Sequence, residues 1–395
     1  MKLIIKILLI CLPLPFILSH YTFLKDYNGS FYILKHSIII LLFLVSSLYY
    51  MVYIRKINKK HILPLSFFFL FFSYLIVNFL IRSNFNTMYI SYILSFLILI
   101  LLSLFLTRID IGNTLLKLLY YSIAIIIFSA IAFSLLNEVE LYAEWTDVSN
   151  GGTKRRWTFG FDHPGYFASF FYVLGILSIL LIKGKVLVKA HYVILFLSLV
   201  LIFLSHTRNS FMALVLFILF SYSNKSFRFT KYLSILVFIT FVVLISNDFN
   251  TINALSTGRF LNWATQLLYN YDQFSWFFGT GIGNAIRIDF HSNSGDVAAY
   301  EVMYHADNFF FDIFLQFGSI GLVLLIGFLL AILWIASKQQ DTIVKRNIIA
   351  ALFSMSFYSF FDSSLLSTGN LVSIVMWLIV FQQLNLKYIQ QEIKC

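Results

Sequence analysis

The sequence is poor in charged residues and in cysteine, and each shortage excludes a class of protein. Aspartate, glutamate, lysine and arginine make up 11% of the 395 residues, whereas a soluble globular domain has about 25%. A water-soluble globular protein is therefore excluded. Cys11 lies in the first apolar run and Cys395 ends the chain, so the two cysteines predict neither a disulfide framework nor a metal-binding cluster.

The familiar motifs of metal and cofactor chemistry are also missing. The predicted outer loops have no aspartates paired at i, i+2 that would hold Mg²⁺, and the chain has no HExxH or GxSxG motif. The glycines of GTGIGN lack the strand–turn–helix context of a phosphate-binding loop. We therefore expect no cofactor and no metal, and any catalysis would depend on side-chain bases and cations.

The sequence is rich in apolar residues. Hydrophobic residues make up 60% of the chain, phenylalanine alone contributes 46, and the mean hydropathy is +0.87. A helix needs roughly 20 apolar residues to cross a bilayer, and about twelve such runs recur. The fold class is therefore an all-α, polytopic transmembrane helical bundle, with residues 1–395 as one integral membrane domain. The first run has no small-residue cleavage site and is interpreted as a retained span. The predicted spans are Leu3–Leu24, Phe31–Tyr53, Ile62–Ile81, Met88–Leu106, Thr114–Leu136, Tyr166–Ile182, Val186–Leu204, Ser210–Tyr222, Tyr232–Ser246, Ile320–Ala336, Asn347–Phe361 and Gly369–Leu384.

Basic residues are concentrated on the connections of one side. That side and the two termini carry nineteen of the 28 lysines and arginines, but three of the 17 acidic residues. The positive-inside rule then places both termini in the cytoplasm. The net charge of +11 thus reflects orientation in the cytoplasmic membrane and predicts contact with membrane lipids, not with nucleic acid. On the outer face lie a loop, 137–165, and a large loop, 247–319, that contains short helices, one of them re-entrant or interfacial.

Arginines are the notable cations of the predicted outer face. Arg156 precedes WTFGFDHP, Arg208 stands in SHTRNSF, and Arg259 opens GRFLNW. A guanidinium group is a planar fork that binds phosphate through two hydrogen bonds and keeps its charge. Converging arginines would suit a diphosphate. The alternative is that they contact lipid phosphates at headgroup level.

A polar stripe follows within HADNFFFDIFLQFGSIG. If this segment is helical, its members recur at i, i+3, i+7 and i+11 and share one face among phenylalanines. Such a face near a membrane predicts contact with water or a substrate. The first member is His305. Its imidazole has a reference pKa of ~6.5, which makes it the best acid–base candidate. The alternative is that His305 is a surface histidine at a helix start. The stripe consists of His305, Asn308, Asp312 and Gln316.

Weaker candidates for contact with a glycan are Asn308 and Asp312 of this stripe, the neighbouring Asp307, and His163, which precedes Pro164. For His163 the alternative is that it only shapes the turn.

Four segments, in this order, resemble motifs of the O-antigen ligase and polymerase superfamily. RRWTFGFDHPGYFAS is similar to an Arg…Phe-Gly…His-Pro segment of polysaccharide polymerases from Gram-positive capsule and exopolysaccharide clusters, which often have asparagine where Gly165 stands here. SHTRNSFMALVLFIL resembles the arginine motif that begins a span. GRFLNWATQLL with FFGTGIGN resembles the Arg…Trp…Gly-rich loop, and HADNFFFDIFLQFGSIGLVLLIGF the His–Asn…Gly-x-x-Gly segment. The likeness covers roughly Lys154–Gly327.

The resemblance implies an inverting, metal-independent glycosyltransferase with its active site on the outer face. The implied donor is an oligosaccharide on undecaprenyl diphosphate. Arg208 and Arg259, with Arg156 as a third candidate, would hold the diphosphate, and His305 would deprotonate the acceptor hydroxyl. Fixed cations would stabilise the negative charge that grows on the leaving diphosphate. Because the sugar passes through an oxocarbenium-like state, a base within about 3 Å of the acceptor oxygen should suffice to activate the hydroxyl. A flippase and a chain-length regulator are further candidate partners.

Several functions stay open. A polymerase of lipid-linked repeat units is favoured by the Arg…His-Pro segment, and a ligase that moves finished glycan to another acceptor is close behind. A flippase for the same lipids would predict polar or broken helices near the midplane, whereas the predicted spans here read as hydrocarbon. A non-enzymatic scaffold would have no reason to align a polar stripe.

Overall fold

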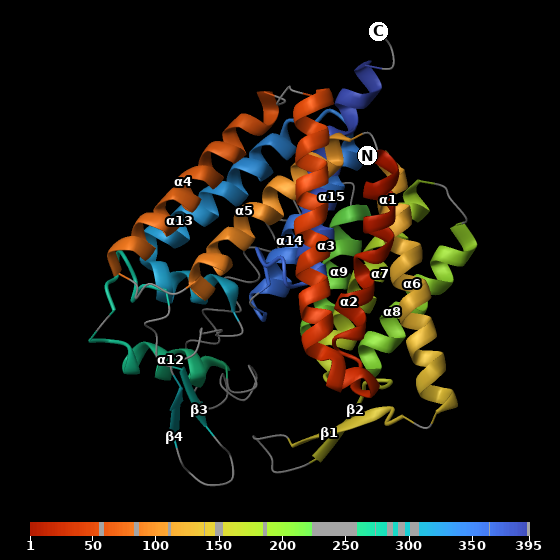
Figure 1. Cartoon of the computed structure of the whole chain (residues 1–395), viewed down its shortest axis with the longest axis horizontal. Coiled ribbons are helices and arrows are strands. Elements are labelled where there is room, and N and C mark those ends of the chain that lie inside the picture. Colours follow the sequence, from red (N-terminus) through yellow and green to blue (C-terminus); the bar gives the residue numbers. More distant parts are fainter. Residues whose placement is uncertain are drawn as a thin grey trace.

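The structure is a computed structural model, and Figure 1 shows a bundle of long helices with two short strand pairs at one end. The predicted all-α membrane architecture is confirmed. The structure describes residues 1–54, 59–82, 87–109, 112–137, 139–146, 153–184, 188–222, 259–272, 274–282, 287–290, 297–300, 308–362 and 364–392.

The helices follow the apolar runs of the sequence. The first part of the chain forms α1 (Lys2–Cys11), α2 (Pro13–Leu18), the 3-10 helix η1 (Thr22–Tyr27), α3 (Asn28–Tyr49), the π-helical turn η2 (Tyr50–Ile54), α4 (Lys59–Arg82), α5 (Thr87–Arg108) and α6 (Gly112–Leu136). The second part forms α7 (Pro164–Lys183), α8 (Val188–Leu204), α9 (Arg208–Tyr222), α12 (Arg259–Tyr269), α13 (Phe309–Ser337), α14 (Thr342–Ser359) and α15 (Leu371–Glu392).

Every predicted span within the described residues coincides with a helix. The first is divided at Leu12, because Pro13 and Pro15 lack the amide hydrogens that would continue the ladder. The ninth, Tyr232–Ser246, lies outside the described residues. In the part of the chain that the structure describes, six helical segments are long and apolar enough to cross a membrane, namely Thr22–Ile54, His61–Arg82, Tyr89–Arg108, Thr114–Leu136, Pro164–Lys183 and Phe309–Ser337. Val188–Leu204, Arg208–Tyr222 and Leu371–Asn385 are shorter apolar helices. The chain is thus an integral membrane protein.

Helices α7 and α15 form the centre of the bundle. The apolar window of α7 is 89% buried, against 33% for Thr22–Ile54. In α15 the side chains from Leu371 to Leu384 are all buried, with Trp377 fully so. A helix that is apolar on all sides is stable inside the protein or in lipid, so the surrounding helices can keep apolar faces outward.

The bundle is less purely hydrocarbon than the sequence predicts. At the end of the bundle opposite the strands, His61 Nε2 and Asn385 Oδ1 lie 2.7 Å apart, and Asn385 Nδ2 donates to Thr107 Oγ1 over 3.0 Å. Lys183 Nζ donates to Asn347 Oδ1 over 2.9 Å, close by on α7 and α14. These buried groups satisfy one another across five helices, α4, α5, α7, α14 and α15, which is what a polar group in an apolar interior requires.

Two antiparallel strand pairs interrupt the all-helical pattern and were not predicted. Strands β1 (Tyr142–Thr146) and β2 (Thr153–Trp157) pair so that Tyr142 lies opposite Trp157. Strands β3 (Arg287–Phe290) and β4 (Val297–Tyr300) form the second pair. Figure 1 shows both pairs and α12 at the lower end of the bundle, whereas α1 begins and α15 ends toward the upper end.

Helix α13 is broken at Gly318, where φ is 68° and ψ is −169°. This region of backbone space is open essentially to glycine alone. The break divides α13 into a short segment, Phe309–Phe317, which we call the platform helix, and the long span that follows. Because a helix end leaves carbonyl and amide groups without intrahelical partners, the break creates two sets of groups that need hydrogen bonds.

The loop Trp276–Gly281 supplies those hydrogen bonds. Its Thr280 and Gly281 amides donate to the carbonyls of Leu315 and Gln316 over 2.9 and 3.0 Å. In return its Trp276 and Phe277 carbonyls accept from the amides of residues 319 and 320 over 2.9 and 3.3 Å. The segment Trp276–Gly281 therefore acts as a clamp on the helix break.

The clamp is too close for side chains. A Cβ on Gly318 would lie 2.3 Å from the Phe277 carbonyl oxygen, and one on Gly279 would lie 2.5 Å from the Gln316 carbonyl. Helix α4 closes the arrangement, because Tyr74 Oη donates to the Phe317 carbonyl over 2.7 Å. Asn78 of the same helix donates to the carbonyl of residue 278 over 2.8 Å. The break is thus held from both sides.

Candidate functional site

The His-Pro turn before α7 is the first part of the candidate site. His163 is the N-cap of α7, and its Nδ1 accepts a hydrogen bond from the Gly165 amide over 2.9 Å. A Cβ on Gly165 would lie 2.8 Å from that nitrogen. An asparagine at position 165, frequent in the resembling polymerases, would therefore displace the His163 ring from this capping position. The turn-shaping interpretation of His163 is thus supported by its geometry.

The SHTR loop between α8 and α9 adjoins this turn. Thr207 Oγ1 donates to the Pro164 carbonyl over 3.3 Å and lies 2.8 Å from Ser205 Oγ. His206 adopts a left-handed backbone with φ of 54°, which turns the chain sharply into α9. Arg208 is the first residue of α9, and its side chain is exposed. The fold therefore brings together two segments that the sequence singles out separately.

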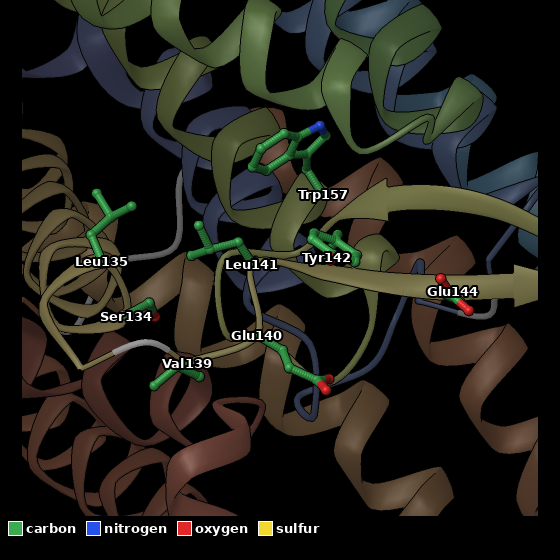
Figure 2. A pocket seen from close by; sticks show the side chains of 8 residues that line it. All are labelled: Ser134, Leu135, Val139, Glu140, Leu141, Tyr142, Glu144 and Trp157. Carbon is green, nitrogen blue, oxygen red and sulfur yellow. The ribbon is translucent and has the colours of Figure 1, made fainter.

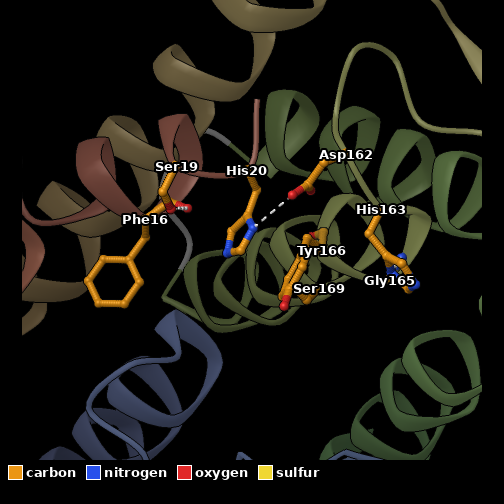
Figure 3. Close-up of polar contacts among 8 residues, drawn as sticks. All are labelled: Phe16, Ser19, His20, Asp162, His163, Gly165, Tyr166 and Ser169. Atoms are coloured by element: carbon orange, nitrogen blue, oxygen red, sulfur yellow. Dashed lines mark hydrogen bonds and ion pairs between the residues drawn. The ribbon is translucent and has the colours of Figure 1, made fainter. Parts of the chain in front are cut away.

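The segment that follows α2 contacts the same turn. Tyr21 and Phe161 form an antiparallel bridge, the Asp162 amide donates to the His20 carbonyl over 2.9 Å, and His20 Nδ1 lies 3.5 Å from Asp162 Oδ2. The His20 ring stacks on Tyr166 with centroids 3.5 Å apart. Figure 3 shows His20 between Asp162 and Tyr166, with His163 on the far side of the turn. Sequence reasoning missed this contact, since nothing local marks His20 as a partner of the turn.

Helix α12 packs on the platform helix, and the contact is made by one aromatic cluster. Trp263 is 8% exposed and packs on Leu315. Its ring stacks on Phe311 at 5.9 Å and meets Phe360 edge-on at 5.7 Å. The Trp of the GRFLNW motif is therefore a packing anchor. Arg259 begins α12, one helical turn before it.

The start of the platform helix differs from the predicted polar stripe. The helix begins at Phe309, and Asn308 is its N-cap, with Oδ1 accepting from the amides of residues 310 and 311 over 3.0 and 3.1 Å. Asp312 and Gln316 do lie on the helix, but they are 0% and 2% exposed. The predicted stripe was expected to face water or a substrate; these two residues are not open to water, and their contact with a substrate stays a prediction. His305 and Asp307 lie outside the described residues.

Asp362, in the connection between α14 and α15, joins the two halves of the site. Its carbonyl accepts from the Phe309 amide over 3.2 Å, and its carboxylate is hydrogen-bonded to the Tyr358 hydroxyl. Tyr358 in turn stacks on Tyr172 of α7, which begins at the His-Pro turn, with ring centroids 5.2 Å apart. Sequence reasoning did not select this aspartate; the available signal was an acidic residue in the short polar segment FDSS between two apolar runs.

The third arginine candidate lies on the hairpin. Arg156 is half-buried on β2, and β2 packs beside α8. Because successive strand residues point to opposite faces, Arg156 and Arg155 face apart. Arg155 is exposed and pairs with Glu144 over 3.4 Å. Among the described residues, no group of three or more His, Cys, Asp or Glu side chains has the arrangement of a metal site.

Residues 193–326 match the family model described as O-antigen ligase. The match confirms the resemblance of this stretch to the O-antigen ligase and polymerase superfamily. No curated protein gives a match to the chain. The matched stretch contains Arg208, Arg259 and His305, but begins after the His-Pro turn. The narrower likeness to Gram-positive polymerases stays a prediction.

Proposed function

We propose that this membrane protein, whose residues 193–326 match the O-antigen ligase family, joins lipid-linked oligosaccharide repeat units into a polysaccharide. The donor is a repeat unit on undecaprenyl diphosphate, and the transfer inverts the anomeric centre. The reaction takes place on the outer face of a bacterial cell membrane, with both termini in the cytoplasm and the loops 137–165 and 247–319 outside.

The observation that carries the proposal is the contact between the SHTR loop and the His-Pro turn. Thr207 Oγ1 donates to the Pro164 carbonyl over 3.3 Å, which joins a motif inside the family match to the segment outside it that resembles repeat-unit polymerases. Asp362 supports the same grouping, because it connects the start of α13 to Tyr358, which stacks on Tyr172 of α7. The polymerase-like turn thus contacts a loop of the matched stretch, and this contact is why we favour a polymerase over a ligase.

The proposed chemistry is a displacement at the anomeric carbon. The acceptor hydroxyl oxygen forms a bond to that carbon as the bond to the diphosphate oxygen breaks, and undecaprenyl diphosphate leaves with the electron pair. Arg208, Arg259 and Arg156 stabilise the charge that grows on the diphosphate. His305 accepts the hydroxyl proton. His163 and Asp307 contact the glycan, and Asn308 and Asp312 hold the start of the platform helix.

The test is a reconstitution. Purified protein in proteoliposomes is given undecaprenyl-diphosphate-linked repeat units in the presence of EDTA, and the products are separated by size. A ladder of products with regular spacing supports the polymerase. Transfer of a single unit to an added second acceptor, with no ladder, indicates the ligase instead. No transfer to any acceptor would refute both.

A further inference from the structure

A cavity outside the family match lies where α6 meets the first strand pair. Its volume is about 780 Å³, and it opens between Ser134 at the end of α6, the following segment 139–141, and the strand pair. Figure 2 shows Tyr142, Trp157 and two glutamates around the same opening. None of these residues has a part in the proposed transfer chemistry.

The lining selects a class of ligand. Tyr142 and Trp157 are 42% and 37% exposed, so each presents ring surface to an occupant. Glu140 and Glu144 supply carboxylates that accept hydrogen bonds from hydroxyl groups. Arg155 lies beside them and pairs with Glu144 over 3.4 Å, so its charge is already matched by a carboxylate. A sugar ring, with an apolar face of C–H groups and an edge of hydroxyls, matches a wall of aromatic rings and acceptors.

The aromatic walls are held in place before any ligand binds. Trp157 stacks on Phe159 and Phe159 on Phe167, each at 5.3 Å, so the ring is continuous with the bundle core. Tyr142 packs edge-on against Trp157 at 6.4 Å. Its other neighbour is Arg155, whose guanidinium carbon lies 4.8 Å above the Tyr142 ring centroid. Rigid aromatic groups of this kind lose little conformational freedom on binding, which favours affinity.

The backbone of the cavity is equally fixed. The amide of Gly160 donates to the Glu140 carbonyl over 3.1 Å, and the amide of Thr158 donates to the Leu141 carbonyl over 2.9 Å. Position 160 needs glycine. Its φ is 85°, and a Cβ there would lie 2.4 Å from Ser134 Oγ and 2.8 Å from the Tyr21 ring. The cavity wall therefore continues directly into the His-Pro turn of the candidate site.

We propose that this cavity is a glycan-binding subsite, in which Trp157 and Tyr142 contact the face of an uncharged sugar ring while Glu140 and Glu144 accept its hydroxyls. The proposal rests on the proposed function, since the glycan is taken to be part of the donor, the acceptor or the polymer. The subsite holds that glycan beside the His-Pro turn, next to Arg156 on the same strand.

The experiment measures binding separately from transfer. The probe is the free oligosaccharide released by mild acid from the lipid-linked repeat unit, which has neither lipid nor diphosphate, and binding to purified full-length protein is followed by calorimetry. Trp157→Ala should weaken binding about tenfold or more, as removal of a buried aromatic anchor does at other binding sites, and Glu140→Gln should weaken it less. Trp334→Ala removes a tryptophan that is 51% exposed on α13 and serves as the matched control.

Three outcomes would overturn the subsite. These are no binding of the oligosaccharide to the wild type, equal binding by wild type and Trp157→Ala, or displacement of the oligosaccharide by inorganic pyrophosphate. A loss of binding to phosphatidylglycerol vesicles in Trp157→Ala, with oligosaccharide binding intact, would mark the ring as a membrane contact and also overturn it. Failure of the proposed function looks different, because the oligosaccharide would still bind while no transfer occurred.

Discussion

Replacement of Gly318 by alanine tests the clamp between the Trp276–Gly281 loop and the broken helix. Alanine at φ of 68° and ψ of −169° costs on the order of 1–3 kcal/mol in backbone strain alone. Its Cβ would lie 2.3 Å from the Phe277 oxygen and 2.5 Å from the nitrogen of residue 278. Both contacts are with backbone, so the loop must move, and each hydrogen bond lost adds roughly 1 kcal/mol. The total is about 3 kcal/mol or more.

Hydrogen exchange measures this change where it occurs. In detergent micelles the amides of Thr280, Gly281, Ser319 and Ile320 report the clamp, because all four donate hydrogen bonds across it. A local opening made easier by about 3 kcal/mol accelerates their exchange about 100-fold. Peptides that cover residues 274–282 and 315–322 resolve this by mass spectrometry.

A matched glycine provides the control for this measurement. Gly29 lies in the first turn of α3, and a Cβ there would meet nothing within 4 Å, so Gly29→Ala should leave the clamp peptides unchanged. Tyr74→Phe removes one hydroxyl, whose proton is shared between the Phe317 carbonyl at 2.7 Å and the Phe277 carbonyl at 3.3 Å, and should accelerate exchange by only about fivefold. If Gly318→Ala exchanges at the wild-type rate in both peptides, the clamp is not the structure that holds the break.

Three further predictions concern the chemistry and the core. His305→Ala should abolish the product ladder while the protein keeps its wild-type elution and thermal midpoint; a normal ladder would remove His305 as the base. Arg208→Lys should reduce transfer at least tenfold, because the two-pronged contact with phosphate is lost although the charge is kept, and full activity would argue against that contact. Asn385→Leu should lower the thermal midpoint, since His61 and Thr107 lose their buried partner at a cost of about 1–3 kcal/mol each; an unchanged midpoint would show that the polar cluster contributes nothing to stability.

The sequence predicted the spans well because a bilayer imposes a length and a composition on each of them. The ends of α5 and α6 differ from the predicted spans Met88–Leu106 and Thr114–Leu136 by two residues or fewer. The strand pair Tyr142–Trp157 was not predicted, because two five-residue strands in a polar loop carry too short an alternation to be distinguished from irregular chain.

Contacts between distant segments were beyond the sequence. Nothing near Gly318 indicates that the amides of Thr280 and Gly281 will serve its broken ladder, although both glycine-containing motifs were visible. The same holds for His20 and Asp162, and for Asp362 at the start of α13. Periodicity also did not predict that Asp312 and Gln316 are buried. It assigns residues to one face of a helix, but it does not tell whether that face meets solvent or protein.

The platform helix is held from three directions, and this changes how loss of activity must be interpreted. The clamp fixes its end at Gly318, the Asp362 carbonyl fixes its first amide, and Trp263, seated between Phe311 and Phe360, fixes its side. A site supported so closely loses its geometry when any support is removed. A variant such as Gly318→Ala would then be inactive with every arginine and His305 intact. Exchange in the clamp peptides separates the two cases, because a lost support accelerates it and a lost base does not.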